Sequence, residues 1–182
     1  MKKGAMSEIY KTNEIVQIAY FVKDVEVAAR KAHETLGIGP FFIYKNIELV
    51  NVTYRGNETE LDHTSAYGQS GSLMIEFCQQ NDTSRSAFSD MYPDGGEGIH
   101  HAAMFVDSVS EEMRRFKTLG HETVTHYFTR DGNVEVAFVD TRNLYGHMIE
   151  LYEPTEALTG FYSSVRKAAN EWDRKELFRY LN

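Results

Sequence analysis

The hydrophobic pattern at the start of the chain changes from strand-like to helix-like and back again. Residues 15–22 are rich in β-branched and aromatic side chains, as is typical of a strand. Asp24 can cap a following helix and Gly37 can end it. The β-rich stretches beyond this helix are 41–44, 47–55, 60–67 and 72–79. This order of elements predicts a βαβββ module over residues 14–80.

The same order of elements returns in the second half of the chain. A β-rich stretch, 100–106, precedes a helix in which Ser108 and Glu111 form a possible capping box and Gly120 is the stop. The later β-rich stretches are 123–130, 133–140 and 147–153, and Asp131-Gly132 between the first two is typical of a hairpin turn. We expect a second βαβββ module over residues 99–154.

Three short matches in the same order indicate that the modules arose by duplication. The matching segments are 16–22 with 100–106, Thr35-Leu36-Gly37 with Thr118-Leu119-Gly120, and Met74-Ile75-Glu76 with Met148-Ile149-Glu150. A module of about 65 residues is too small to bury a good core by itself. We therefore expect the two modules to pair into one domain of the α+β class.

Two further segments complete the predicted organisation. Residues 81–98 are polar and contain Pro93 and three glycines, which is typical of a surface linker. In the tail, 155–182, the apolar side chains follow helical spacing, at Phe161, Val165, Ala168 and Trp172. The tail is predicted to be a helix docked on the body or on a second subunit, with a mobile lid over a site as the alternative.

Four polar side chains occupy equivalent strand positions among apolar neighbours. Because alternate residues of a strand share a face, each of these side chains lies beside large apolar ones. The polar set is Gln17, Glu76, His101 and Glu150, and the apolar set on the same faces is Phe21, Met74, Phe105, Met148 and Tyr152. A carboxylate in an apolar strand costs several kcal/mol to bury unless a partner compensates its charge.

A metal ion is the simplest common partner for this polar set. If the modules pair about a pseudo-two-fold axis, the four groups converge as two carboxylates, one imidazole and one amide oxygen. This mixture suits Zn²⁺, Ni²⁺, Co²⁺, Mn²⁺ or Fe²⁺ and leaves positions open for water or substrate. The alternative is that each glutamate pairs with an Arg or Lys and that the histidine is an ordinary core residue. The apolar set is expected to line the substrate pocket beside these groups, with plain core packing between the two modules as the alternative.

Two more histidines lie near the predicted site. His63, on a strand expected to line the cavity, is a candidate for orienting substrate or moving a proton, with a surface or hydrogen-bonding role as the alternative. His100 should face away from His101 and serve the structure. If the strand phase is shifted by one residue, the two exchange roles.

Composition narrows the classes of function. The formal charge is −8, from 19 Lys and Arg against 27 Asp and Glu, so nucleic acid is an unfavoured partner. Apolar runs of about eight residues are far below the roughly 20 needed to cross a membrane, and Met1-Lys2-Lys3 is not followed by an apolar signal region. The lone Cys78 excludes an intrachain disulfide framework and favours a reducing cytoplasm.

These features resemble the vicinal oxygen chelate superfamily, which includes glyoxalase I, methylmalonyl-CoA epimerase, extradiol dioxygenases and bleomycin-resistance proteins. The resemblance covers residues 14–154. It rests on the two βαβββ modules, the strand openings Gln17-Ile18-Ala19 and His101-Ala102-Ala103, and the strand ends Met74-Ile75-Glu76-Phe77 and Met148-Ile149-Glu150-Leu151.

The resemblance implies a cupped, mixed and mostly antiparallel sheet with one divalent metal ion in the cavity. Metal positions of the family lie on the first and last strands of each module, which here hold Gln17, Glu76, His101 and Glu150. Glyoxalase I enzymes are known with this set, whereas the epimerases usually have His in place of Gln17. Relatives often form dimers, so we expect a homodimer that acts on a small molecule.

Proton transfer α to a carbonyl is the leading hypothesis for the reaction. Glu76 and Glu150 would act as base and acid on a hydrophobic carbonyl or acyl-thioester substrate, giving an isomerase, epimerase or lyase. One alternative is a metal-free binding protein of the bleomycin-resistance type. A second alternative, an extradiol dioxygenase, is weakened because Gln17 removes one His of the two-His, one-carboxylate iron site.

Overall fold

The computed structural model describes residues 12–130 and 133–181. The predicted hairpin turn at 131–132 and the first eleven residues lie outside these ranges. The first module contains β1 (Ile15–Phe21), α1 (Val25–Leu36), β2 (Phe41–Tyr44), β3 (Leu49–Tyr54), β4 (Asn57–Glu58), β5 (His63–Ser70) and β6 (Leu73–Gln80). The second contains β7 (Gly98–Phe105), α3 (Val109–Thr118), β8 (Thr123–Thr129), β9 (Glu135–Val139), α4 (Arg142–Tyr145) and β10 (Met148–Tyr152).

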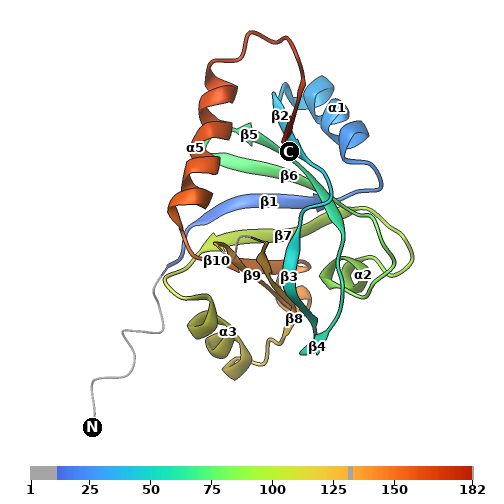
Figure 1. Cartoon of the computed structure of the whole chain (residues 1–182), viewed down its shortest axis with the longest axis vertical. Helices are drawn as coiled ribbons and strands as arrows, with labels where there is room; N and C mark the ends of the chain where they lie inside the picture. Colours follow the sequence, from blue (N-terminus) through green and yellow to red (C-terminus); the bar gives the residue numbers. More distant parts are fainter. Residues whose placement is uncertain (1–11, 131–132, 182) are drawn as a thin grey trace.

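The strands form one mixed sheet in the order β11-β2-β5-β6-β1-β7-β10-β9-β8-β3-β4, where β11 (Phe178–Leu181) belongs to the tail. The first strands of the modules, β1 and β7, pair antiparallel at its centre (Figure 1). Each has the last strand of its own module, β6 or β10, in parallel on its other side. The register is the same in both, since Gln17 pairs with Met74 as His101 pairs with Met148. The predicted α+β class with a mostly antiparallel sheet is confirmed.

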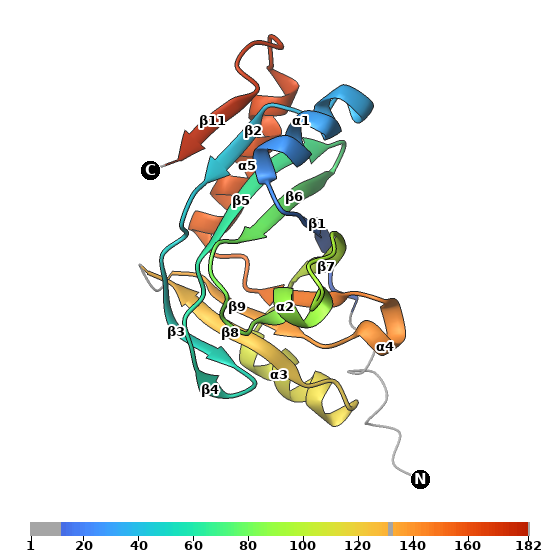
Figure 2. The ribbon, with the colours of Figure 1, turned by 90° about the vertical axis from the view of Figure 1, so that its right-hand side faces the viewer.

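The sheet is strongly curved, as Figure 2 shows. Strands β2 and β3 are second and tenth in the sheet order, yet only residues 45–48 join them, a connection that spans at most about 18 Å. The two ends of the sheet must therefore approach each other. Strand β3 pairs with β8 of the second module, so one strand of the first module joins the strands of the second.

Helices α1 and α3 cover the outer, convex face of the sheet (Figure 2). The Asp24 side chain accepts hydrogen bonds from the N–H groups that open α1, and Gly37 ends it with a left-handed φ of 71°. In α3, Ser108 accepts a hydrogen bond from the Glu111 N–H, which is one half of the predicted capping box. These helix caps could be predicted from the sequence because each depends only on residues close to it in the chain.

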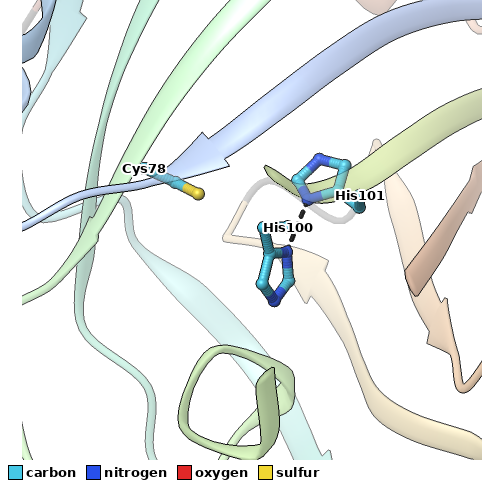
Figure 3. A group of neighbouring side chains, drawn as sticks. All are labelled: Cys78, His100 and His101. Carbon is cyan, nitrogen blue, oxygen red and sulfur yellow. Dashed lines mark hydrogen bonds between the residues drawn. The ribbon is translucent and has the colours of Figure 1, made fainter. Parts of the chain in front are cut away.

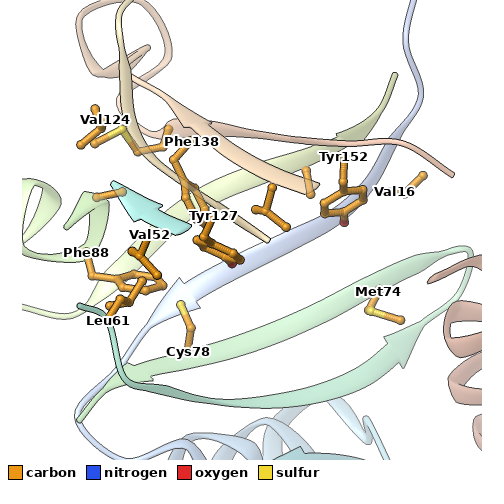
Figure 4. Close-up of a cluster of buried hydrophobic side chains, with 14 of the residues drawn as sticks. Val16, Val52, Leu61, Met74, Cys78, Phe88, Val124, Tyr127, Phe138 and Tyr152 are labelled. Atoms are coloured by element: carbon orange, nitrogen blue, oxygen red, sulfur yellow. The ribbon is translucent and has the colours of Figure 1, made fainter. Parts of the chain in front are cut away.

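The concave face of the sheet holds the largest buried apolar cluster, part of which is drawn in Figure 4. Its members come from both modules and include Val52, Met74, Cys78, Phe88, Val124, Tyr127, Phe138, Met148 and Tyr152. The halves of the chain are therefore held together by a shared core, as their small size requires.

The predicted surface linker 81–98 is partly buried. It contains α2 (Ala87–Met91), which Ser86 opens with a capping box, and Phe88 is only 2% exposed. The Phe88 ring lies 5.5 Å from the ring of Phe21 and 5.9 Å from that of Phe138. The surface prediction is wrong here because the polar composition of the segment concealed one helical turn whose aromatic side chain fills the end of the core.

The tail docks on the body of the same chain. Helix α5 (Glu156–Asn170) lies against the concave side, where Phe161 meets Tyr67 and Phe42 edge to face. The tail is not helical to its end, since β11 adds to the sheet beside β2. Within the described ranges, no helix is long and apolar enough to cross a membrane.

Candidate metal centre

The four central strands bring the predicted polar set together on the concave face. Gln17 lies on β1, Glu76 on β6, His101 on β7 and Glu150 on β10. All four side chains are buried, and all four line the same cavity. The sequence repeat thus corresponds to neighbouring positions in space, because β1 and β7 pair with each other and each carries its own last strand.

His101 stands between the two carboxylates. Its Nε2 atom is 3.1 Å from Glu150 Oε2 and 3.4 Å from Glu76 Oε2. Neither contact has hydrogen-bond geometry, so Nε2 is a buried nitrogen without a hydrogen-bond partner. The possible ligand atoms of Glu76, His101 and Glu150 all lie within 4.8 Å of one another. This donor set fits a divalent cation, which would neutralise both carboxylates and satisfy Nε2.

The alternative of a Lys or Arg partner does not hold. Within residues 12–130 and 133–181, His101 is the ion-pair partner of both Glu76 and Glu150, and no Lys or Arg reaches either carboxylate. Two buried carboxylates with one imidazole leave negative charge uncompensated unless a proton or a cation is bound.

The ionisation of the three groups is coupled. Burial disfavours the charged form of His101, but Glu150 and Glu76 outweigh it and raise the pKa of His101 to about 9. Burial also opposes ionisation of Glu76, yet the contact with His101 lowers the pKa of Glu76 below its usual value. For Glu150, burial prevails over His101 and, with the repulsion from Glu76, raises its pKa. Without a metal, a proton bound to His101 compensates part of the negative charge of the two carboxylates.

Gln17 is oriented by two neighbours. Its Nε2 donates to the sulfur of Met74 at 3.4 Å, and its Oε1 accepts a hydrogen bond from the Tyr152 hydroxyl at 3.3 Å. The Tyr152 hydroxyl also bonds to the hydroxyl of Tyr162 on α5. The amide oxygen of Gln17 is therefore a candidate fourth donor, and α5 is connected to the site through the two tyrosines.

A cavity of about 610 Å³ opens from this centre along the concave face. Its wall is mainly apolar and aromatic, with contributions from both modules, from α2 and from α5. The residues that line it beside the polar set include Ile47, Leu49, His63, Tyr67, Phe88, Tyr127, Val136, Phe138, Tyr152, Leu158, Phe161 and Tyr162. An ion pair between exposed Glu48 and Arg130 marks where it reaches the surface.

Only Tyr152 and His63 of the predicted pocket residues line this cavity. The other four, Phe21, Phe105, Met74 and Met148, share faces with the polar set but do not line it. Phe21 is covered by Phe88 of α2, and Phe105 by Tyr162 of α5. Both methionines are completely buried. Strand alternation gives the face of a side chain but does not show which part of that face other elements cover.

His63 faces the cavity as a neutral side chain. It is 4% exposed, and its Nδ1 has no hydrogen-bond partner. Burial lowers the pKa of His63 against the opposing attraction of Glu76. Its ring packs near those of Phe88 and Tyr127. The tyrosines Tyr67, Tyr127 and Tyr162 were missed, although strand alternation from His63 would have identified Tyr67.

His100 does not face away from His101, contrary to prediction. Between Ala19 and Tyr20 of β1 the paired residue of β7 changes from His101 to Ile99, so His100 is an extra, bulged residue. The bulge turns its side chain toward the same side as His101, and their Nδ1 atoms are 2.8 Å apart (Figure 3). Cys78, His100 and His101 form a second group of buried side chains with possible ligand atoms within 4.8 Å.

Comparison with known proteins agrees with this fold. Residues 16–138 match the family model of the glyoxalase/bleomycin resistance protein/dioxygenase superfamily. A hypothetical protein from Bacillus halodurans C-125 is similar in structure, with a TM-score of 0.55, 22% identity, and coverage of 80% of this chain and 97% of the other. Methylmalonyl-CoA epimerase from Mycobacterium tuberculosis has a TM-score of 0.51 at 22% identity, with coverage of 80% and 90%. A search of curated protein sequences returned no significant match.

The matched segment includes most of both modules, from the strand that carries Gln17 to the strand that carries Phe138. The chain therefore belongs to the glyoxalase/bleomycin resistance protein/dioxygenase superfamily. The name of this superfamily covers glyoxalases, bleomycin resistance proteins and dioxygenases, so membership alone does not assign a reaction to this chain.

Proposed function

We propose that the protein is a divalent-metal-dependent enzyme that transfers a proton α to a carbonyl group, as an isomerase, epimerase or lyase. The observation that carries this proposal is the approach of two buried carboxylates to His101 Nε2, at 3.1 and 3.4 Å, from equivalent strands of the two modules. Such a pair has no structural explanation that avoids a bound cation or proton.

Glu76, His101 and Glu150 would hold the ion, with Gln17 as a further oxygen donor. When bound, it would serve as a Lewis acid that stabilises negative charge on the substrate oxygen. The chain itself would move the proton. Glu76 and Glu150 both approach His101 Nε2, and they come from the last strands of the two modules. One carboxylate, when not bound to the ion, would take the α-proton, and the other, in its protonated form, would return a proton to the same carbon.

The cavity wall favours a hydrophobic carbonyl or acyl-thioester substrate. Aromatic and aliphatic side chains provide most of it, and within it the neutral His63 and the hydroxyl of Tyr127 can hydrogen-bond a polar group. Because burial raises the pKa of Tyr127 well above its usual value, this hydroxyl stays protonated and can donate. A negatively charged group of the substrate would contact Arg130 at the mouth of the cavity.

Two probes follow from this class of substrate. One is methylmalonyl-CoA, because the fold is similar to that of a methylmalonyl-CoA epimerase. The other is the hemithioacetal of methylglyoxal and glutathione, because Gln17 replaces the His usual in the epimerases and matches the set known in glyoxalase I. We expect the purified protein to exchange the α-hydrogen of one of them for deuterium in D₂O, as measured by ¹H NMR.

Replacement of Glu150 tests the chemistry. Glu150→Gln keeps the shape but removes the proton acceptor, so we expect exchange to fall by about 10²- to 10⁴-fold. Glu122→Gln, at an exposed position in the connection between α3 and β8 and outside the cavity, is the matched control and should keep the wild-type rate. An unchanged rate in Glu150→Gln would contradict the proposal.

A metal-free binding protein is the second candidate. The aromatic cavity would also suit a drug-sized ligand, as in bleomycin-resistance relatives. The metal content of protein purified without added metal, together with the effect of EDTA on ligand binding, distinguishes the enzyme from the binding protein. A nearly stoichiometric divalent ion supports the enzyme, whereas no ion together with EDTA-insensitive ligand binding supports the binding protein. The dioxygenase remains a weaker third candidate, because Gln17 supplies an amide where that iron site needs His.

The assembly is proposed to be a homodimer in the reducing cytoplasm. Ile15 and Ile99 are about half exposed at opposite ends of the β1–β7 pair and do not form one patch, so the proposal of a dimer rests on the resemblance to relatives that often form dimers. Cys78 is a free, buried cysteine. Light scattering coupled to gel filtration would give the mass of the assembly and contradict the dimer if it equals 20.9 kDa.

A further inference from the structure

The two central strands each carry a bulge at the same position of the repeat. In β7 the extra residue is His100, and in β1 the register skips Val16 between Ile15 and Gln17. Val16 and His100 are equivalent in the alignment of the two modules. Each bulge therefore precedes a residue of the polar set, Gln17 or His101. The module whose candidate ligand is a histidine has a histidine at its bulge, and the module whose candidate ligand is an amide has a valine.

The contact between His100 and His101 is a hydrogen bond. Their Nδ1 atoms lie 2.8 Å apart, and the two rings are nearly perpendicular (Figure 3). Two nitrogens that bind one tetrahedral zinc ion at about 2.0 Å would be about 3.3 Å apart. In addition, the Cys78 thiol already contacts the carbonyl oxygen of Tyr20 at 3.3 Å. The group of Cys78, His100 and His101 is thus better explained by hydrogen bonding than as a second metal site.

The direction of this hydrogen bond follows from the other side of His101. Its Nε2 faces Glu76 and Glu150, where a cation requires a lone pair. A neutral His101 then carries its proton on Nδ1 and donates it to His100. The Nδ1 of His100 must accept, so the proton of His100 lies on its Nε2.

We propose that His100 is a positioning residue whose Nδ1 lone pair fixes the tautomer and ring orientation of His101. This inference rests on the proposed function in so far as His101 Nε2 is a metal ligand. Metal-binding histidines usually donate their second N–H to a carboxylate or a backbone carbonyl. Here a neutral imidazole takes that place, so no third negative charge is added beside Glu76 and Glu150.

Aromatic neighbours hold the ring of His100, while its Nε2, the atom that would carry the proton, has no hydrogen-bond partner within the described residues. The side chain is completely buried, with its ring centre 4.6 Å from that of Phe88 and 5.6 Å from that of Phe138. Such aromatic packing disfavours a charged imidazole and restrains the ring. Gln17 needs no such partner, because an amide has no tautomers and because Met74 and Tyr152 already orient it.

Two substitutions separate the hydrogen bond from the volume of the ring. His100→Val introduces the residue that the first module has at its own bulge and removes the acceptor. His100→Asn retains an acceptor oxygen near the position of Nδ1. We expect His100→Val to weaken Zn²⁺ binding by about 10- to 100-fold and His100→Asn to stay within a few-fold of wild type. Equal Zn²⁺ affinity in folded wild-type and His100→Val protein would overturn the proposal.

A spectroscopic measurement on wild-type protein does not depend on any variant folding. Long-range ¹H–¹⁵N correlation spectra of ¹⁵N-histidine-labelled protein report which ring nitrogen carries the proton. With or without Zn²⁺, His100 should be the Nε2–H tautomer, and with Zn²⁺ His101 should be the Nδ1–H tautomer. An Nδ1–H tautomer of His100 would contradict the inference. If wild-type protein fails to bind Zn²⁺ or any other divalent ion, the proposed function fails, whereas an Nδ1–H tautomer of His100 in metal-free protein would overturn this inference alone.

Discussion

His101 is the residue that connects the two carboxylates to the cation that they would hold. Its pKa of about 9 means that the metal-free site carries an imidazolium at neutral pH. A metal ion can bind Nε2 only after that proton leaves. The proton and the metal ion therefore compete for the same buried position between Glu76 and Glu150.

This competition predicts a pH dependence of metal binding. Below pH 9 the fraction of His101 that is neutral falls about tenfold per pH unit, so the apparent affinity for Zn²⁺ should rise about tenfold per unit between pH 6 and 8. Calorimetric titrations at several pH values, in buffers of different ionisation enthalpy, give the affinity and the number of protons released. An affinity that does not change over this range, with no proton released, would contradict the assignment of His101.

Among the elements, β5 shows how closely the convex core is packed. An added Cβ at Gly68 would lie 2.6 Å from a ring carbon of Phe41, which is completely buried. Helix α5 offers the opposite case. A Cβ at Gly160 would meet no atom within 4 Å, and the residue lies in the interior of the helix.

These two glycines give a matched pair of stability predictions. Gly68→Ala should destabilise the fold by about 1 to 3 kcal/mol through overpacking against Phe41. Gly160→Ala should stabilise it by about 0.5 to 1 kcal/mol, because alanine loses less backbone entropy in a helix. Urea unfolding of the wild-type protein and of both variants measures these changes in the free energy of unfolding. Equal midpoints for the two variants would show that the packing around β5 is looser than the structure indicates.

The elements also show what the sequence can predict and where prediction stops. The caps at Asp24 and Ser108 and the convergence of the polar set depend on local spacing and on the repeat, so both were predictable. The bulge at His100 was not, because one inserted residue leaves the hydrophobic pattern of the strand almost unchanged while it reverses the side of a single side chain.

Long-range pairing was the other missed feature. Strand β3 leaves its own module for β8, and β11 adds to β2 from the far end of the chain. Each of these strands has a suitable composition, but the partner of a strand is chosen by the curvature of the whole sheet. The burial of Phe88 on α2 was also not predicted. It depends on the space that the two modules leave between them, which is again a property of the whole sheet.

At the scale of the whole molecule, the candidate site joins the two modules. Its side chains come from β1 and β6 of the first module and from β7 and β10 of the second. A cation held there would bind the folded chain but not the separated strands. It would therefore stabilise the paired arrangement by mass action.

This arrangement predicts that metal stabilises the fold. Zn²⁺ at 100 times its dissociation constant should add about 2.7 kcal/mol to the free energy of unfolding, and EDTA should reverse the effect. Differential scanning calorimetry measures the change. Glu76→Gln with Glu150→Gln should abolish the response to Zn²⁺, whereas Glu122→Gln, outside the site, should keep it. A double variant that responds like wild type would place the metal elsewhere.

Anomalous diffraction from crystals grown with Zn²⁺, recorded on both sides of the zinc absorption edge, examines the centre most directly. We expect one strong anomalous peak between Glu76, His101 and Glu150, with His101 bound through Nε2. A zinc-containing crystal with no peak there, or with the three side chains turned away from one another, would contradict the metal centre and the chemistry proposed for it.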